Sequence, residues 1–317
     1  MKVHLYASLP HYLKHMEPIW RELPDELRGD LVYDASRGGY WPPNQHDVVL
    51  VAGWQDVRMM QNRARLIYVE HGAGQAYLGD PLVADTPGYS GHGGHKHRNV
   101  VGYICPSQTV ADRWETAPAI AVGCPKMDRW YRVEEMHQPS RTVCFAWHWD
   151  SELCPETRTA FPHYEADMPL IVARWKDLGW TVYGHAHPRW GRPFVELLER
   201  CGMTILPRDD DVFAKAHVLV LDNSSIGYEF ASLGRPTIWL NAPWYRRDVE
   251  HGLRFWSHVP GLQLGDPGAL LDEMVIEGTL HPAASRLPGW WRGVYEHADG
   301  TSSQRAAQWV TELVGSL

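Results

Sequence analysis

No stretch of this 317-residue sequence is apolar enough to cross a membrane. A spanning helix needs about 20 consecutive apolar residues, and no run approaches that length. The first residues, MKVHLYASLP, also hold too short an apolar stretch for a signal peptide. They are better explained as a first strand that enters a turn at Pro10. The sequence therefore predicts a cytoplasmic protein whose contact with a membrane could only be peripheral.

Cysteine is scarce, and its spacing argues against cysteine-based sites. The sequence has 5 cysteines, an odd number, and it contains no C-x-x-C pair. A disulfide framework or a structural zinc site needs paired or clustered cysteines. We therefore expect free buried thiols at Cys105, Cys124, Cys144, Cys154 and Cys201.

An excess of basic residues is also missing. The formal net charge is −8 with neutral histidines, and residues 1–135 and 136–317 each hold more acidic than basic residues. Proteins that bind nucleic acid broadly present basic surfaces to its phosphates. The charge does not favour a nucleic acid partner, although a local basic groove would leave a nucleic acid acceptor open.

Motifs of several enzyme classes are absent. The sequence contains no Walker A motif, no G-x-S-x-G and no H-E-x-x-H, so ATPase and hydrolase assignments have no support. The G-A-G-Q at residues 72–75 is too short for a dinucleotide-binding fingerprint.

What is present centres on residues 216–241, AHVLVLDNSSIGYEFASLGRPTIWLN. The apolar run at 218–221 predicts a strand buried on both faces of a parallel sheet. A helix should follow the polar residues after this run, and Gly234 with Pro236 should end it. Residues 237–240 predict the next strand. The stretch is therefore one strand–helix–strand unit.

The polar residues of this unit stand at the start of the helix. A helix N-terminus offers unpaired N–H groups and a partial positive charge, and small hydroxyl residues there let a phosphate approach closely. We therefore predict that Ser224 and Ser225 cradle a diphosphate. An ordinary capped helix, with Asp222 as a cap, is the alternative.

Strands and helices alternate along the whole chain. Strands are expected at residues 3–7, 31–33, 47–53, 66–69, 100–104, 119–122, 143–147, 181–183, 218–221 and 237–240, and helices at 11–22, 163–178, 194–201, 267–276 and 302–315. This alternation predicts an α/β architecture with parallel sheets and right-handed crossovers. A polar segment near residues 130–141 is the expected linker between two halves.

Six short motifs resemble those of the CDP-glycerol glycerophosphotransferases, the teichoic acid primases and polymerases. The stretch from Asp222 resembles the family's D-Y-S-S-x-x-x-D-F … P-x-I signature. The other five, in the family's order, are Val69-Glu70-His71-Gly72, Gly123-Cys124-Pro125-Lys126-Met127-Asp128, Ala146-Trp147-His148-Trp149, His187-Pro188 and Asp299-Gly300-Thr301-Ser302-Ser303-Gln304-Arg305. The resemblance runs from about residue 64 to the C-terminus.

The resemblance implies a GT-B glycosyltransferase fold, in which two Rossmann-like parallel-sheet domains face each other across a cleft. We expect an N-terminal acceptor domain at residues 1–135 and a nucleotide-donor domain at 136–300. A C-terminal helix at 301–317 is expected to cross back to the first domain.

The resemblance also implies the site residues. His71 is the candidate base for an acceptor hydroxyl, and His187 would contact the donor phosphates, because an imidazole exchanges protons readily near neutral pH. Donor-binding roles are expected for Gly72, Asp222, Asn223, Ser224, Ser225, Glu229, Ser302, Ser303 and Arg305. Alternatively, Ser302 and Ser303 cap the last helix, and Glu229 lies on a solvated helix face.

Three histidines alternate with glycines in residues 91–97: His92, His95 and His97. Imidazole suits zinc or copper, but a glycine-rich segment supplies no rigid ligand geometry. We expect no metal site and no obligatory cofactor, and we interpret the segment as a mobile loop on the acceptor side.

The sequence departs from the family mainly on the acceptor side. Ala76 and Tyr77 stand where the family has a lysine, while Asn223 replaces its tyrosine and Glu229 its aspartate. We therefore expect a transferase with a nucleotide-diphosphate donor, CDP-glycerol-like or a nucleotide-sugar, and a hydroxyl acceptor of unknown class. The alternatives are a glycosyltransferase that acts on a glycan, a small molecule or a modified nucleobase, a nucleotide-sugar 2-epimerase, and a catalytically silent binding module.

Overall fold

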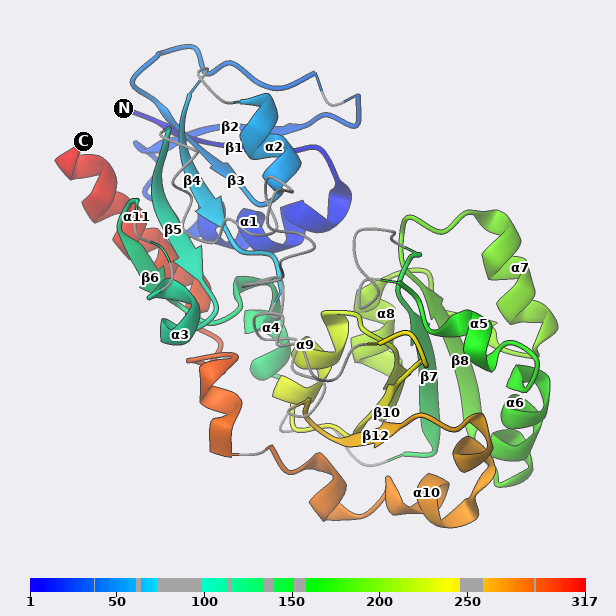
Figure 1. Cartoon of the computed structure of the whole chain (residues 1–317). Coiled ribbons are helices and arrows are strands. Elements are labelled where there is room, and N and C mark those ends of the chain that lie inside the picture. The colour runs from blue at the N-terminus through cyan, green and yellow to red at the C-terminus, as the bar shows by residue number, and fades with distance from the viewer. Residues whose placement is uncertain are drawn as a thin grey trace. The chain divides into compact units, whose positions relative to one another are not determined.

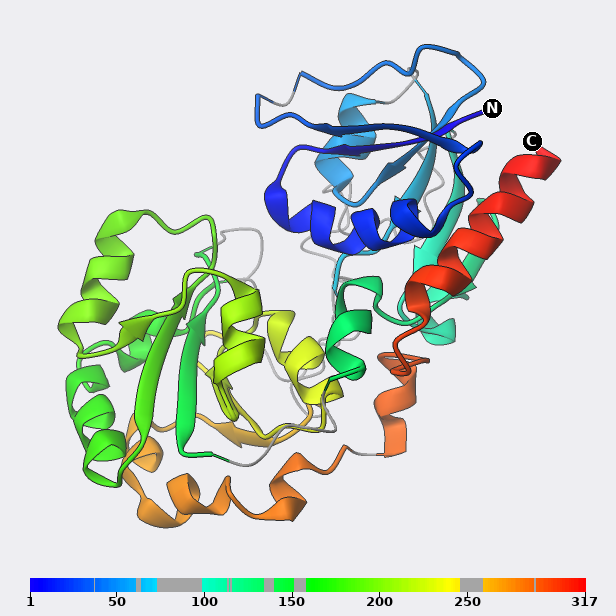
Figure 2. The same ribbon diagram turned by 180° about the vertical axis from the view of Figure 1, so that it is seen from behind.

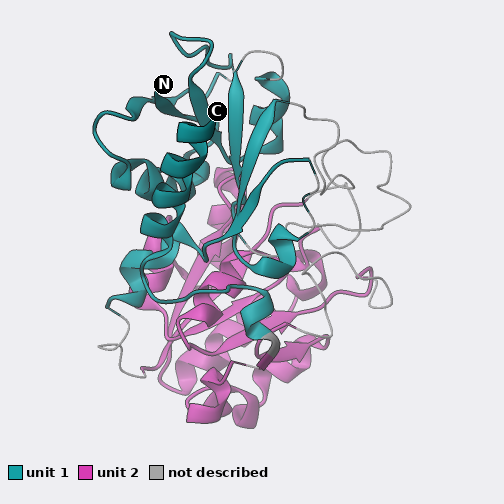
Figure 3. Cartoon of the chain, turned by 90° about the vertical axis from the view of Figure 1, so that its left-hand side faces the viewer, with its two compact units in different colours: residues 1–135, 251–253, 290–317 teal, residues 136–250, 254–289 magenta. Residues whose placement is uncertain are grey.

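The computed structural model describes residues 1–317 except 37, 61–63, 73–98, 113, 115, 134–139, 151–157, 246–258 and 288. The described residues form two compact units (Figure 3). Unit 1 contains the described residues of 1–135 and 290–317, and unit 2 contains those of 136–289. Residues 290–300, expected in the second domain, therefore belong to unit 1 together with the last helix.

Unit 1 is built on a six-stranded parallel sheet. Its strands are β1 (Val3–Ala7), β2 (Arg28–Tyr33), β3 (Val48–Val51), β4 (Arg65–Val69), β5 (Val100–Cys105) and β6 (Ala119–Ala121). Their order in the sheet is β2-β1-β3-β4-β5-β6. The central strands β3 and β4 are almost wholly buried, as apolar runs of this kind predict for a sheet covered on both faces.

Two helices from opposite ends of the sequence cover the same face of this sheet (Figure 2). They are α1 (Pro10–Glu22) and α11 (Ser302–Ser316), and they contact each other. Met16 and Ile19 of α1 and Val310 of α11 pack with Ile67 and Val69 of β4 in one core cluster. The other face carries α2 (Trp54–Met59), whose Trp54 stacks on Tyr68 of β4 with ring centroids 4.6 Å apart.

Unit 2 is built on a second six-stranded parallel sheet. Its strands are β7 (Thr142–Trp147), β8 (Thr181–Ala186), β9 (Thr204–Ile205), β10 (Val218–Leu221), β11 (Thr237–Leu240) and β12 (Leu262–Leu264). Their order is β12-β11-β10-β7-β8-β9. Strands β8 and β9 are therefore added on one side of β7, and β10, β11 and β12 are added on its other side. The carboxyl ends of β7 and β10 mark the switch point where open α/β sheets bind their ligands.

Helices cover both faces of the unit 2 sheet (Figure 1). One face carries α5 (Phe161–Tyr164), α6 (Met168–Asp177) and α7 (Arg192–Arg200), and the other carries α8 (Asp209–Lys215) and α9 (Ile226–Ser232). Right-handed crossovers require this arrangement once the direction of strand addition reverses. Helix α9 lies close to the sheet, since a Cβ at Gly227 would overlap the side chains of Leu221 and Trp239.

Most of the expected elements are confirmed, and the α/β fold class with two parallel sheets is confirmed as well. The expected helix at 163–178 is two helices, α5 and α6, with Pro169 at the start of the second. The helix expected at 267–276 begins as a 3-10 helix, η4 (Pro267–Leu271), before α10 (Glu273–Gly278). Strands β9 and β12, the short helices α3 (Gln108–Ala111) and α4 (Asp128–Tyr131), and helix α8 were not expected. Among the described residues, no helix combines the length and the apolar character needed to cross a membrane.

Candidate functional site

A buried aspartate organises the switch point of unit 2. Asp222 follows β10 directly, and its side chain is completely buried. Its carboxylate accepts hydrogen bonds from the backbone N–H of His148 (2.9 Å), the hydroxyl of Thr159 (2.9 Å) and the backbone N–H of Ala160 (3.0 Å). These bonds join the residue after β7 to the start of α5. Asp222 therefore holds the loops around the switch point and does not cap α9, as the alternative interpretation expected.

Burial also changes the acidity of this carboxyl group. Removal from water disfavours the charged form and raises the pKa of Asp222 to about 6, although the hydrogen bonds it accepts act in the opposite direction. The group is thus placed to order the neighbouring backbone, and it offers no surface to a ligand.

Two accessible serines, Ser224 and Ser225, follow Asn223. Ser224 and Ser225 are half-buried, and Ser225 occupies the N-cap position of α9. No hydrogen bond joins either hydroxyl to another residue in the described part of the chain. Asn223 is buried and its side-chain amide donates to the carbonyl of Arg158. Glu229 is 1% exposed, so it does not lie on a solvated helix face.

The predicted catalytic residue His187 lies beside a second histidine at the same sheet edge. His187 follows β8, His148 follows the neighbouring strand β7, and their ring centroids are 5.3 Å apart. Nδ1 of His187 accepts the backbone N–H of Arg189 (3.1 Å), so the neutral ring carries its proton on Nε2. Nδ1 of His148 instead donates to the carbonyl of Trp149 (2.8 Å).

The other predicted catalytic residue, His71, lies in unit 1 after β4. Its Nδ1 donates to the carbonyl of Ala52 (2.5 Å), because a carbonyl oxygen can only accept. The neutral ring therefore has an unprotonated Nε2 that can take up a proton. Aromatic rings of α1 surround it, with Tyr12 at 4.7 Å, His11 at 6.0 Å and His15 at 6.2 Å between centroids.

The residue after His71 has a conformational role. Gly72 is buried and adopts a φ of 87°, a left-handed value that favours glycine. The turn after β4 therefore requires glycine at this position whether or not Gly72 contacts a donor.

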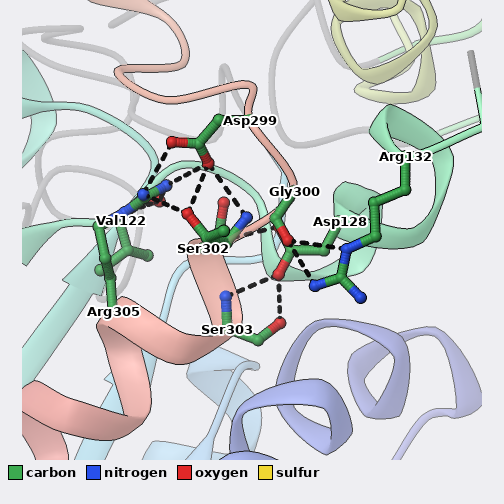
Figure 4. A network of polar contacts seen from close by, with 9 residues as sticks. Val122, Asp128, Arg132, Asp299, Gly300, Ser302, Ser303 and Arg305 are labelled. Carbon is green, nitrogen blue, oxygen red and sulfur yellow. Dashed lines mark hydrogen bonds and ion pairs between the residues drawn. The ribbon is translucent and has the colours of Figure 1, made fainter. Parts of the chain in front are cut away.

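The last three predicted donor-binding residues form a polar network in unit 1 (Figure 4). The backbone N–H groups of Ser302 and Ser303, and the hydroxyl of Ser303, donate to the carboxylate of Asp128. Arg305 makes a two-pronged ion pair with Asp299, at 2.9 Å for each bond, and this pair holds the pKa of Asp299 well below its usual range. The carboxylate of Asp128 thus caps the N-terminus of α11, whereas Ser302 and Ser303 lie in its first turn and do not cap it with their own side chains.

Loss of this cap should weaken the fold of unit 1. In Asp128→Ala, two backbone N–H groups and a hydroxyl lose a charged partner, so we expect about 2 kcal/mol less stability in urea unfolding. Affinity for a nucleotide donor should stay the same. A Ser303→Ala variant that keeps full stability but loses donor affinity would instead support the donor-binding role of Ser303.

Two further results concern the predicted residues. The histidine segment with His92, His95 and His97 lies outside the described residues, so its interpretation as a loop stays a prediction.

Sequence reasoning did not single out His148, Trp149 and Arg189 as site residues, although the first two lie in a motif that it did identify. Their position after β7 and β8, beside the expected His187, is the signal that could have found them.

Two six-stranded parallel sheets with interleaved helices define a chain of two Rossmann-like domains, and similar structures give this architecture its class, the GT-B fold. The wall teichoic acid polymerase TagF has a TM-score of 0.64 and 12% identity, over 99% of this chain and 89% of that one. A putative UDP-N-acetylglucosamine 2-epimerase from Listeria monocytogenes has a TM-score of 0.61 and 14% identity, over 100% of this chain and 97% of the epimerase. The S. aureus MnaA–UDP structure has a TM-score of 0.61 and 13% identity, over 100% of this chain and 98% of MnaA. The chain matches no protein-family model and no curated protein.

Proposed function

We propose that this protein is a transferase that uses a nucleotide-diphosphate donor, either CDP-glycerol-like or a nucleotide-sugar. The observation that carries the proposal is the carboxyl edge of unit 2, where accessible Ser224 and Ser225 follow β10 and His187, with its proton on Nε2, follows β8. Hydroxyls and N–H donors are the groups that bind phosphate oxygens. The similarity to a teichoic acid polymerase and to a UDP-bound protein supports a nucleotide-linked substrate.

The proposed reaction starts at His71. Its unprotonated Nε2 takes the proton of the acceptor hydroxyl, which attacks the phosphorus that bears glycerol, and CMP leaves. His187 and the two serines bind the leaving phosphate through hydrogen bonds that strengthen as its charge develops. This chemistry depends on positioning and charge stabilisation, so the proposal needs no obligatory metal ion or other cofactor.

The same residues would serve two other reactions. Attack at the anomeric carbon of a nucleotide-sugar would make the protein a glycosyltransferase, with a glycan, a small molecule or a modified nucleobase as the acceptor. A nucleotide-sugar 2-epimerase is the third candidate, and the similarity to a putative UDP-N-acetylglucosamine 2-epimerase favours it. The epimerase needs no acceptor, so product analysis with and without added acceptors separates it from both transferases.

A thermal-shift panel of CDP-, UDP-, GDP- and dTDP-linked donors tests the proposal. A ligand that binds only the native state raises its stability by about 2.7 kcal/mol at a hundredfold excess over Kd. We expect one nucleotide class to raise the melting temperature above the others. A panel without any shift, repeated by calorimetry at millimolar ligand, would refute a nucleotide-linked substrate.

The double variant Ser224→Ala/Ser225→Ala should bind the donor more weakly and fold normally. Each lost charge-assisted hydrogen bond to phosphate costs about 1.5–3 kcal/mol, whereas neither hydroxyl bonds to another described residue in the free protein. Calorimetric titration measures the loss. Ser140→Ala is the matched control, because Ser140 lies before β7 at the amino end of the same sheet. Equal affinities in the double variant and the control would remove the serines from the donor site.

A further inference from the structure

We propose that Arg189 is an anion-binding residue of unit 2, which binds a phosphate of the substrate together with His187. The proposal rests on the proposed function and extends it by a residue that supplies positive charge. Arg189 comes two residues after His187, at the carboxyl end of β8. Its backbone N–H already fixes the ring of His187, so the two side chains share one turn.

The guanidinium group of Arg189 is ordered by an aromatic ring. It lies over the indole of Trp149, 4.3 Å from the ring centroid. Trp149 follows His148 and is also close to His187, with 6.3 Å between their centroids. A cation stacked on a ring keeps its N–H groups in the guanidinium plane free to donate. Because the stacking limits the motion of Arg189 beforehand, less side-chain entropy is lost when it binds an anion.

Arg189 differs from other arginines of unit 2 in its partners. Several of those pair with a carboxylate: Arg141 with Glu277, Arg158 with Asp150, Arg174 with Glu273, Arg192 with Glu196 and Arg208 with Asp211. The guanidinium of Arg189 has no ion pair or hydrogen bond with any residue that the structure describes. Asp150, which directly follows Trp149 in the sequence, pairs with Arg158 at 3.1 Å. An anionic substrate would therefore meet a positive charge that no carboxylate in the described part of the chain neutralises.

The loop that carries Trp149 is firmly held. The backbone N–H of His148 is bound by the buried carboxylate of Asp222, and its carbonyl accepts the indole N–H of Trp190 at 2.9 Å. Both anchors come from elsewhere in unit 2, so the residues beside His187 are fixed by the fold of this unit alone. This order distinguishes the Arg189–Trp149 pair from a long side chain that lies on an exposed ring by chance.

Calorimetric titration with inorganic pyrophosphate, CDP and UDP tests the proposal. We expect Arg189→Ala to weaken the binding of pyrophosphate, and of the nucleotide that binds, by about 10- to 100-fold, as expected for a lost hydrogen bond between charged groups. The affinity of Arg189→Lys should lie between those of the wild type and Arg189→Ala, since lysine keeps the charge and loses the stacked geometry. Kd should also depend less on NaCl concentration in Arg189→Ala, because a lost ion pair can no longer be screened.

Arg174→Ala is the matched control, because Arg174 is a half-buried arginine of the same unit that pairs with Glu273. The proposal fails if Arg189→Ala binds pyrophosphate and nucleotide like the control, or if the wild type binds none of the three probes. If Arg189 is needed for pyrophosphate but no nucleotide-linked donor binds, Arg189 remains an anion-binding residue and the proposed function fails. If donors bind normally without Arg189, the proposed function remains and the role of Arg189 is refuted.

Discussion

His71→Ala should lower kcat by about 10²- to 10⁴-fold, the usual contribution of a positioned general base. The structure gives the physical reason. The bond from Nδ1 to the carbonyl of Ala52 fixes the neutral ring with its lone pair on Nε2, and the ring packs against Tyr12. Donor binding should barely change, because the predicted donor residues Ser224, Ser225 and His187 belong to unit 2. Steady-state kinetics with the donor identified by thermal shift measure both quantities.

The pH dependence of the rate gives a second readout. An imidazolium cannot take up a proton, so the wild-type rate should fall in acid while His71→Ala loses this acid limb. His46→Ala is the control, since His46 is an exposed histidine of the same unit. If His71→Ala keeps its kcat and loses donor affinity, His71 is a ligand contact. If the variant changes neither quantity, another residue is the base.

Asp222→Ala should cost about 3–5 kcal/mol of folding stability, the largest loss that we expect from any single substitution outside the apolar cores. Three buried donors, on His148, Thr159 and Ala160, would lose their acceptor at once, and each unsatisfied group costs about 1–3 kcal/mol. Asp222→Asn should lower the folding stability by less than Asp222→Ala does. It still weakens the fold, because the amide NH₂ group replaces one carboxylate oxygen and there faces an N–H or O–H donor that has lost its acceptor. Urea unfolding measures the loss.

The acidity of Asp222 adds a pH signature. Its pKa of about 6 in the folded protein lies above the usual value near 3.8, so the folded state holds the proton more tightly. Its contribution to stability is full below about pH 4 and is lost as the pH rises through about 6, a change of up to about 3 kcal/mol. Asp222→Asn should remove this part of the pH profile.

Asp272→Asn serves as the control for both Asp222 variants. Asp272 is an exposed aspartate of the same unit that accepts one backbone N–H at the start of α10. Asparagine caps a helix about as well as aspartate does, so Asp272→Asn should change the folding stability little. Equal stability losses for Asp222→Asn and Asp272→Asn, with parallel pH profiles, would contradict the role of Asp222 at the switch point.

The sequence predicts most of the sheet strands because long apolar runs and their flanking glycines are local signals. The elements that it missed lack such signals. Strand β9 has only two residues, β12 is partly exposed, and α8 opens with three acidic residues that have no apolar stripe before them. Their positions depend on packing against distant parts of the chain.

Some features of the site also follow from local sequence patterns, whereas others depend on contacts between residues that are distant in sequence. The positions of His71 and His187 at strand ends follow from local patterns, since each motif comes directly after a predicted strand. The partners of Asp222 do not, because Thr159 and Ala160 are 63 and 62 residues away in sequence. The bond from Ser303 to Asp128 spans 175 residues, so the motif at residues 299–305 gave no hint that a distant aspartate accepts the first N–H groups of the last helix.

The position of α11 in unit 1 has a consequence for synthesis on the ribosome. The sheet of unit 1 is complete by residue 121, but Ala306, Ala307, Val310 and Val314 of its core follow all of unit 2. A nascent chain must therefore leave the part of this sheet face that α11 covers exposed until translation of this helix ends. The described residues of unit 2 all lie within residues 136–289, so unit 2 needs no later part of the chain and can fold as it emerges from the ribosome. Chaperones that bind nascent chains should therefore hold unit 1 longer than unit 2.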